Sequence, residues 1–213
     1  FKDTLPAAFH ESLCFLSGPS FAKEVAQKMP TAVALAAYDP SIAKTVQEIF
    51  SSPYFRVYTN DDVIGVEVAG SLKNVVAIAA GVLEGMGYGY NTMAALLTRG
   101  LAEMARLGMA MGGNLQTFSG LAGMGDLVLT CTGGLSRNRT LGTRLGKGEK
   151  LDDILKNAKT VAEGVKTAKA ARALANKFEV DMPIVEEVYQ LLYEGKDPKA
   201  AVKDLMSREL KGE

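Results

Sequence analysis

Residues 55–84, FRVYTNDDVIGVEVAGSLKNVVAIAAGVLE, contain the point at which the chain changes from one kind of structure to another. Phe55 to Thr59 alternates and is rich in aromatic and β-branched residues, which favours a strand. Asn60-Asp61-Asp62 breaks that pattern, and either aspartate can cap a helix that runs to about Glu84. This helix is apolar on nearly all sides, which is typical of a helix buried in a core.

Upstream of Asn60, short apolar runs alternate with helical segments. We expect a strand at 12–16, a helix that Ser20 caps and that runs through Lys28, a strand at 31–38, and a helix that Asp39 or Ser41 caps and that ends near Phe50. With the strand at 55–59, the order is strand, helix, strand, helix, strand. This order indicates part of an α/β layer.

Downstream of Asp62 the pattern is helical. Asn91 is expected to cap a second long helix that ends near Met111, where Gly112-Gly113 stops it. Residues 114–134 are expected to form a loop. Further helices are predicted at 137–146, 151–157, 161–178, 183–194 and 198–207. The predicted fold class is therefore α/β followed by all-α.

The composition argues against several classes of protein. The 213 residues can form one large domain or two small ones. Lys plus Arg and Asp plus Glu number 24 each, and the resulting net charge of zero argues against a nucleic-acid binder. Cys14 and Cys131 suggest no disulfide framework, which favours a reducing compartment. His10 is the single histidine and lies in no Cys/His cluster, so we expect no metal site.

The apolar run from Val63 to Leu83 is the only stretch near the length of a membrane span. Glu67, Lys73 and Asn74 lie near its middle and would be costly in lipid. We therefore interpret the run as the buried helix of a soluble protein. No signal peptide is visible, and the chain opens with Phe rather than Met, so we expect its true start to lie upstream.

Lys73 is the first residue that could carry chemistry. A lysine buried in the apolar helix would be desolvated, which favours its neutral form and suits acid–base work. Lys73 could instead pair with Glu67 or another carboxylate, or extend its ammonium group to solvent. The residues alone leave these alternatives open.

Two further segments contain glycines next to polar residues. In Gly120–Leu127, GLAGMGDL, small residues would let the backbone approach a ligand close to Asp126, or the segment is a tight turn in which Asp126 caps a helix. Ser136–Arg139, SRNR, follows Gly133-Gly134 and precedes a helix. The N–H groups of a helix start, together with arginines, bind anions and most naturally phosphate. A capped surface helix with solvated arginines is the alternative.

Two other stretches carry less information about function. Thr160–Glu163, TVAE, matches the capping box Ser/Thr-x-x-Glu, which is a structural motif. Gly85, Gly87 and Gly89 come closest to Gly-x-Gly-x-x-Gly, but Tyr90 stands where the last glycine should be, and there is no Walker motif.

Five blocks together resemble the NAD(P)-dependent sn-glycerol-3-phosphate dehydrogenases of the bacterial and plastid type. They occur in the family's order and extend over essentially the whole chain: LSGPSFAKE at 16–24, GSLKNV at 70–75, TRGLAEM at 98–104, GLAGMGDLVLTC at 120–131 and SRNR at 136–139. The resemblance implies hydride transfer between a nicotinamide cofactor, NAD or NADP, and the pair dihydroxyacetone phosphate and sn-glycerol 3-phosphate. The product feeds glycerophospholipid synthesis.

The resemblance also implies roles for individual residues. Lys73 would donate and accept the proton at the substrate oxygen. The implied substrate contacts are Gly18, Ser20, Asn74, Asp126, Thr130, Ser136, Arg137 and Asn138. The implied cofactor contacts are Ala22, Arg137, Val161 and Glu163. For Glu163 this role and the capping box can both hold.

The domain organisation that the resemblance implies has two parts. Residues 1–61 would be the C-terminal remnant of a Rossmann-like NAD(P)-binding domain, and residues 62–213 the helical substrate-binding domain. Family members carry the glycine fingerprint and a further substrate-binding lysine before the first block. We find neither here, so we expect the chain by itself to be inactive.

The expected setting is a homodimer in the cytoplasm or a plastid stroma, with a small phosphorylated substrate and without nucleic acid or membrane. A non-catalytic helical dimerisation or interaction module is one alternative, although such a module has no need of Lys73, Asp126 and Arg137. A related two-domain dehydrogenase with another substrate is the second alternative.

Overall fold

The computed structural model describes residues 4–156, 162–210 and 212. The chain forms two compact units, Phe1–Gly70 with Met104–Leu129, and Ser71–Glu103 with Thr130–Glu213. Two long helices, α3 (Val63–Gly85) and α4 (Tyr90–Ala110), contribute to both units. The sequence-based boundary between residues 61 and 62 divides the chain at a different place and stays a prediction.

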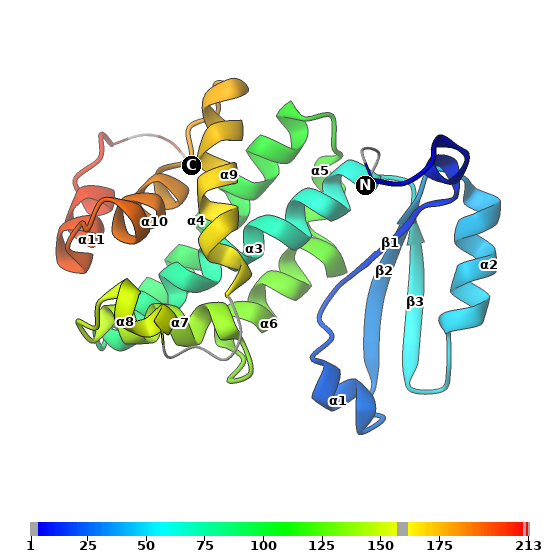
Figure 1. Cartoon of the computed structure of the whole chain (residues 1–213), viewed down its shortest axis with the longest axis horizontal. Helices are drawn as coiled ribbons and strands as arrows, with labels where there is room; N and C mark the ends of the chain where they lie inside the picture. Colours follow the sequence, from blue (N-terminus) through cyan, green and yellow to red (C-terminus); the bar gives the residue numbers. More distant parts are fainter. Residues whose placement is uncertain (1–3, 157–161, 211, 213) are drawn as a thin grey trace. The chain divides into compact units, whose positions relative to one another are not determined.

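A three-stranded sheet forms the centre of the first unit (Figure 1). Its strands β1 (Cys14–Ser17), β2 (Thr31–Ala37) and β3 (Phe55–Asn60) lie in the order β1-β2-β3. β2 is antiparallel to β1 and parallel to β3. A short 3₁₀ segment η1 (Ala7–Ser12) precedes β1, and the helices α1 (Ala22–Ala26) and α2 (Pro40–Phe50) connect the strands. The predicted α/β order is confirmed.

Both faces of this sheet are covered, because neighbouring residues of a strand point to opposite sides. Val33 and Leu35 of β2 pack with Val57 of β3 on one face, with Val46 of α2 against them. The opposite face is formed by Ala34 and Ala36, which pack with Val63, Val66 and Ala122.

Two predicted helix caps are confirmed. The Asp39 carboxylate accepts a hydrogen bond from the backbone N–H of Ser41 at 2.7 Å and caps α2. The Asp62 carboxylate accepts from Gly65 N at 2.8 Å at the start of α3. Asp62 also accepts from the Thr117 hydroxyl at 2.6 Å, so the same side chain ties α3 to the segment that follows α4.

Two other predicted caps are wrong. α1 begins at Ala22 with Phe21 at the N-cap position, because the Ser20 hydroxyl is used within the preceding turn, where it donates to Gly18 O at 3.0 Å. α4 begins at Tyr90 rather than after Asn91, because Gly89 O already accepts the first helical hydrogen bond from Met93 N.

The prediction of a loop at 114–134 is also wrong. This segment contains α5 (Leu115–Phe118), a π-helical turn η2 (Leu121–Gly125) and α6 (Asp126–Thr132). Phe118, Ala122 and Leu127 are buried, so the segment has an apolar side of its own. A Cβ atom on Gly123 would lie 2.1 Å from the carbonyl oxygen of Phe118. The glycines therefore allow close packing here rather than marking a loop.

The second unit is helical, as predicted. It contains the C-terminal part of α3 and much of α4, followed by α7 (Arg137–Gly146), α8 (Leu151–Lys156), α9 (Glu163–Lys177), α10 (Pro183–Tyr193) and α11 (Pro198–Met206). α10 packs against α9 and α11, and α7 packs against α8 and α9. The predicted start of a helix at residue 161 lies outside the described residues.

Within the described residues, α3 is the single helix whose length and composition would suit a membrane span. In its most apolar 18-residue window, 67% is buried inside the structure. A core helix passes the same test of length and composition, so the finding is weak support for a membrane span.

Candidate functional site

Lys73 and Asn74 follow one another on α3. Lys73 is half-buried rather than fully buried, because α3 has a partly accessible side on which Glu67 and Gly70 also lie. The residues on either side of Lys73 are buried: Leu72 is 3% exposed and Asn74 is 8% exposed. Lys73 is thus more accessible than the residues on either side of it, which suits a group that must meet a substrate.

The Asn138 side chain joins three helices at one point of the second unit. Its amide nitrogen donates to the Oδ1 atom of Asn74 on α3 at 2.8 Å. Its amide oxygen accepts from the backbone N–H of Gly164, in the first turn of α9, at 2.9 Å. Asn138 itself lies in the first turn of α7 and is 6% exposed. The residue after Lys73 is therefore fixed by α7, and α7 is fixed to α9.

Arg137 and Glu163 form an ion pair next to this junction. Arg137 Nη2 lies 3.2 Å from Glu163 Oε1, and the Asn74 amide donates to Glu163 Oε2 at 3.5 Å. The side chains of Arg137 and Glu163 are 54% and 63% exposed. Because both side chains remain accessible to water, breaking their ion pair costs little free energy, so each can bind a ligand instead.

The structure does not support a capping box at 160–163. α9 begins at Glu163 with Ala162 at the N-cap position, so Glu163 is the first helical residue and not the third. Its carboxylate is engaged with Arg137 and Asn74 instead. Thr160 and the predicted cofactor contact Val161 lie outside the described residues.

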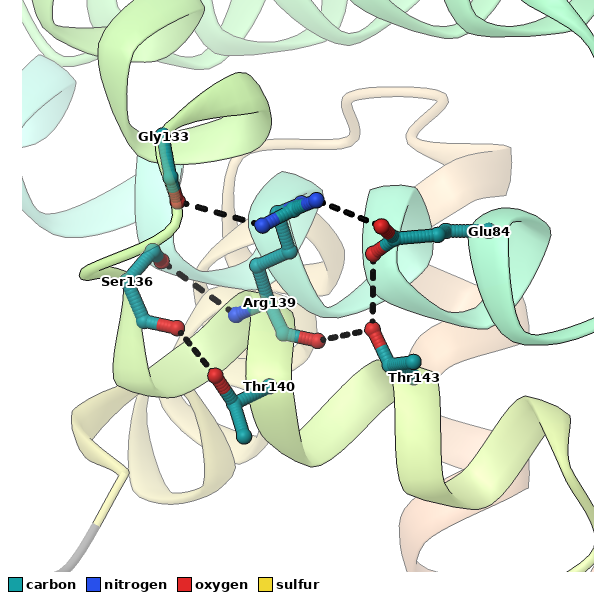
Figure 2. Close-up of polar contacts among 6 residues, drawn as sticks. All are labelled: Glu84, Gly133, Ser136, Arg139, Thr140 and Thr143. Carbon is teal, nitrogen blue, oxygen red and sulfur yellow. Dashed lines mark hydrogen bonds and ion pairs between the residues drawn. The ribbon is translucent and has the colours of Figure 1, made fainter.

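The two arginines of the SRNR block have different surroundings, as Figure 2 shows for Arg139. The Arg139 guanidinium donates to Gly133 O at 3.3 Å and pairs with Glu84 Oε1 at 2.5 Å. Ser136 caps α7, since its Oγ accepts from the backbone N–H of Arg139 at 3.2 Å, and Ser136 is 5% exposed. The alternative of two solvated arginines is therefore wrong for Arg139, whose side chain is 20% exposed.

In the first unit, Asp126 lies beside the turn that follows β1. It is the first residue of α6 and is 3% exposed, and the Ser17 hydroxyl donates to its Oδ2 at 3.4 Å. Gly18 in that turn has φ +148°, and a Cβ there would lie 2.9 Å from Val33 Cα, so a side chain would be both strained and crowded. Sequence reasoning named Asp126 and Gly18 but missed Ser17, although it belongs to the first resemblance block.

Three predicted residues remain to be placed. Thr130 is buried and lies one helical turn after Asp126 on α6, so the two share a face of that helix. Ser20 is half-buried, with its hydroxyl on Gly18 O. Ala22 is exposed at the start of α1, and its methyl group can offer a ligand an apolar contact only.

These side chains have the parts of an acid–base site for a small anionic substrate. Lys73 can exchange a proton, Asn74 and Asn138 can orient a polar group, and Arg137 at a helix start can bind an anion.

Comparison with known proteins identifies the family. The C-terminal model of NAD-dependent glycerol-3-phosphate dehydrogenase matches residues 62–203, and its N-terminal model matches residues 2–43. A glycerol-3-phosphate dehydrogenase [NAD(P)+] of Geobacter metallireducens is 62% identical over 209 residues, which are 98% of this chain and 62% of that relative. The chain belongs to the NAD-dependent glycerol-3-phosphate dehydrogenase family.

Solved structures agree with this assignment. A crystal structure of glycerol-3-phosphate dehydrogenase from Coxiella burnetii matches with a TM-score of 0.89 at 46% identity, over 92% of this chain and 60% of that one. The glycerol-3-phosphate dehydrogenase of Saccharomyces cerevisiae matches with a TM-score of 0.81 at 31% identity, over 91% and 59%. The chain spans 62–64% of the length of the curated relatives that it matches.

Proposed function

We propose that the protein to which this chain belongs is an NAD- or NADP-dependent glycerol-3-phosphate dehydrogenase. It interconverts dihydroxyacetone phosphate and sn-glycerol 3-phosphate and so supplies glycerophospholipid synthesis. The observation that carries the proposal is the meeting of Asn74, Arg137 and Asn138 around one hydrogen-bonded junction, with Lys73 next in the chain to Asn74. The family and the names of its relatives support it.

Lys73 is the proton donor for the ketone. Reduction of a carbonyl group leaves an alkoxide that must be protonated, and a positioned acid contributes about 10²–10⁴-fold to such a step. The Lys73 ammonium donates that proton, and in the reverse direction the neutral amine accepts it from the alcohol. Asn74, held by Asn138, fixes the part of α3 that carries Lys73.

Arg137 is the phosphate ligand. The start of α7 presents backbone N–H groups and the positive end of the helix dipole, and a guanidinium fork matches the oxygens of a phosphate. In the structure the Arg137 guanidinium is paired with the Glu163 carboxylate in an exposed ion pair. A dianionic phosphate can replace this carboxylate as the partner of Arg137. We propose Ser136 and Asn138, on either side of Arg137, as further substrate contacts at this helix start. The family resemblance alone supports Gly18, Ser20, Asp126 and Thr130 as substrate contacts.

The residues present fit a charged and hydroxylated cofactor. Arg137 and Glu163 offer an accessible guanidinium and an accessible carboxylate, which suit phosphate and hydroxyl groups respectively. The family resemblance alone supports Ala22, which is exposed at the start of α1, as a further cofactor contact. The nicotinamide ring supplies the hydride when the cofactor is bound.

We further propose a homodimer in the cytoplasm without nucleic acid or membrane. The balanced charge supports the absence of a nucleic-acid partner, and two cysteines that suggest no disulfide framework, Cys14 and Cys131, suit a reducing compartment. A homodimer is the commonest assembly of soluble enzymes of this kind. Light scattering on the purified full-length protein measures the mass of the assembly and so tests for the dimer.

The test of the activity uses the full-length protein. Oxidation of NADH and of NADPH is followed with dihydroxyacetone phosphate, and reduction of NAD and NADP with sn-glycerol 3-phosphate, 6-phosphogluconate and small hydroxyacids. We expect kcat/KM to be higher for dihydroxyacetone phosphate and sn-glycerol 3-phosphate than for 6-phosphogluconate and the hydroxyacids. Preference for 6-phosphogluconate or a hydroxyacid would indicate a related dehydrogenase, and a stable dimer without any turnover would indicate the interaction module.

A further inference from the structure

Arg139 connects the loop before α7 to the end of α3. One arm of its guanidinium, Nη1, donates to Gly133 O at 3.3 Å, and the other, Nη2, pairs with Glu84 Oε1 at 2.5 Å. Glu84 Oε2 lies 2.9 Å from the Thr143 hydroxyl, one turn further along α7 (Figure 2). Both carboxylate oxygens of Glu84 are therefore directed at α7, and both arms of Arg139 are used.

The loop that Arg139 holds has little stiffness of its own. It reads Gly133-Gly134-Leu135-Ser136, and two consecutive glycines have more backbone freedom than any other pair. A Cβ on Gly134 would have nothing within 4 Å, so packing does not fix this position. Gly133 O accepts from Ser136 N at 3.3 Å as well as from Arg139. The arginine thus adds a second, charge-assisted restraint to a weakly restrained turn.

The body of α7 is already fixed against α3 by close backbone contact. A Cβ on Gly81 of α3 would lie 2.0 Å from Arg139 O, and one on Gly142 of α7 would lie 2.0 Å from Ile78 O. The helices meet where neither carries a side chain, which sets the register between them. What Arg139 adds is therefore control of the loop and the first turn, not attachment of the whole helix.

We propose that Arg139, held by Glu84, is a positioning residue for the phosphate group of the substrate. It sets loop 133–136, and through that loop it sets the Ser136 cap and the orientation of Arg137 and Asn138. In this proposal Arg139 acts through the loop rather than on the anion itself, since each of its Nη atoms already has a protein partner, Gly133 O and Glu84 Oε1. The proposal rests on the proposed function, since it requires a phosphorylated substrate at the start of α7.

The test compares variants of the full-length enzyme that remove one partner each. Arg139→Gln removes both contacts of the guanidinium, and Glu84→Gln leaves the arginine in place but removes the charge that holds it. Arg144→Gln is the matched control, because Arg144 also lies on α7 but, within the part of the chain that the structure describes, its guanidinium pairs with Glu149 and not with loop 133–136. For each, kcat and KM are measured with dihydroxyacetone phosphate, and kcat/KM with dihydroxyacetone.

We expect Arg139→Gln to raise KM for dihydroxyacetone phosphate about tenfold, since a small displacement of a binding group is costly, while kcat changes less than about threefold. The inhibition constant of inorganic phosphate should rise by the same factor as KM. Glu84→Gln should have a smaller effect in the same direction, and Arg139→Lys should lie between wild type and Arg139→Gln because a lysine cannot serve two partners in a fixed fork. Arg144→Gln should resemble wild type.

The outcomes separate this inference from the function itself. A wild-type enzyme without turnover of dihydroxyacetone phosphate would contradict the proposed function. An active wild type whose KM is the same in Arg139→Gln and Arg144→Gln would overturn only the positioning role, as would equal losses with dihydroxyacetone and its phosphate. If Arg139→Gln does not fold, the KM of Glu84→Gln tests the proposal instead. If Glu84→Gln also fails to fold, the pair of Arg139 and Glu84 serves the stability of the fold, and the proposal is overturned.

Discussion

Two helices of the second unit begin in different ways. α10 begins against a buried carboxylate: Glu103, 2% exposed, accepts from Ile184 N at 2.8 Å and from Val185 N at 3.2 Å. α7 begins at the neutral hydroxyl of Ser136 and carries the accessible side chain of Arg137. Because an anion of the protein already fills the start of α10, no ligand can use it, whereas the start of α7 can still receive an anion. Glu103 therefore serves folding, although it lies in the TRGLAEM stretch that resembles the family, whereas Arg137 is available for binding.

The largest effect is expected at the proposed proton donor, Lys73, and should appear in activity alone. Lys73→Met nearly keeps the volume of the side chain and removes the proton donor, so kcat in the full-length enzyme should fall about 10²–10⁴-fold. KM and the thermal midpoint should change little, because Lys73 is half-buried and contributes little to the core. Steady-state kinetics and thermal unfolding on the same preparation measure both. A Lys73→Met enzyme that keeps more than about a tenth of the wild-type kcat would return Lys73 to a structural role.

The start of α10 should show the opposite pattern. Glu103→Gln replaces one of two acceptor oxygens by an amide group, which leaves a buried backbone N–H of α10 without its acceptor. The free energy of unfolding should fall by about 1–3 kcal/mol, while KM for dihydroxyacetone phosphate stays within a factor of about two of the wild type, a difference below 0.5 kcal/mol. Urea unfolding and kinetics provide the two numbers. An unchanged free energy of unfolding together with a raised KM would contradict the assignment of Glu103 to folding and of the start of α7 to binding.

The smallest effect is expected at the far end of α7. The hydrogen bond from Arg144 holds the pKa of Glu149 below its usual range, so this pair stabilises the fold above the ordinary glutamate pKa of about 4.3 and loses its effect as pH falls through the lowered value. Arg144→Gln should therefore lower the thermal midpoint slightly at neutral pH and not at all in strong acid. A difference between the two proteins that grows toward acid pH would contradict this sign.

The sequence predicts the regular elements well where a period or a cap is distinct. The alternation at Phe55–Asn60, the continuous apolar helix after Asp62 and the Asp39 cap all have local causes, and all three are confirmed. The segment 115–125 was missed because its glycines, which allow helical turns to pack closely around Phe118, look like loop residues. The conformational preference of a glycine does not show whether the glycine packs against another part of the backbone.

The site is predicted in part for the same reason. Lys73 and Arg137 could be singled out because a lysine in an apolar helix and an arginine at a helix start are unusual by themselves. No local pattern distinguishes Arg137 from Arg139, two residues later, and only the structure shows that Glu84 engages the second one. Likewise the junction of Asn74, Asn138 and Gly164 depends on three helices that are distant in sequence.

The most direct measurement of the central claim is the phosphate selectivity of Arg137→Ala. In the full-length enzyme, kcat/KM is determined for dihydroxyacetone phosphate and for dihydroxyacetone, with wild type and Arg144→Gln as references. Loss of a charge-assisted contact should lower the value for the phosphorylated substrate about ten- to a hundredfold and leave the value for dihydroxyacetone nearly unchanged. Equal losses for both substrates, or no loss for either, would contradict the assignment of the start of α7 as the phosphate site.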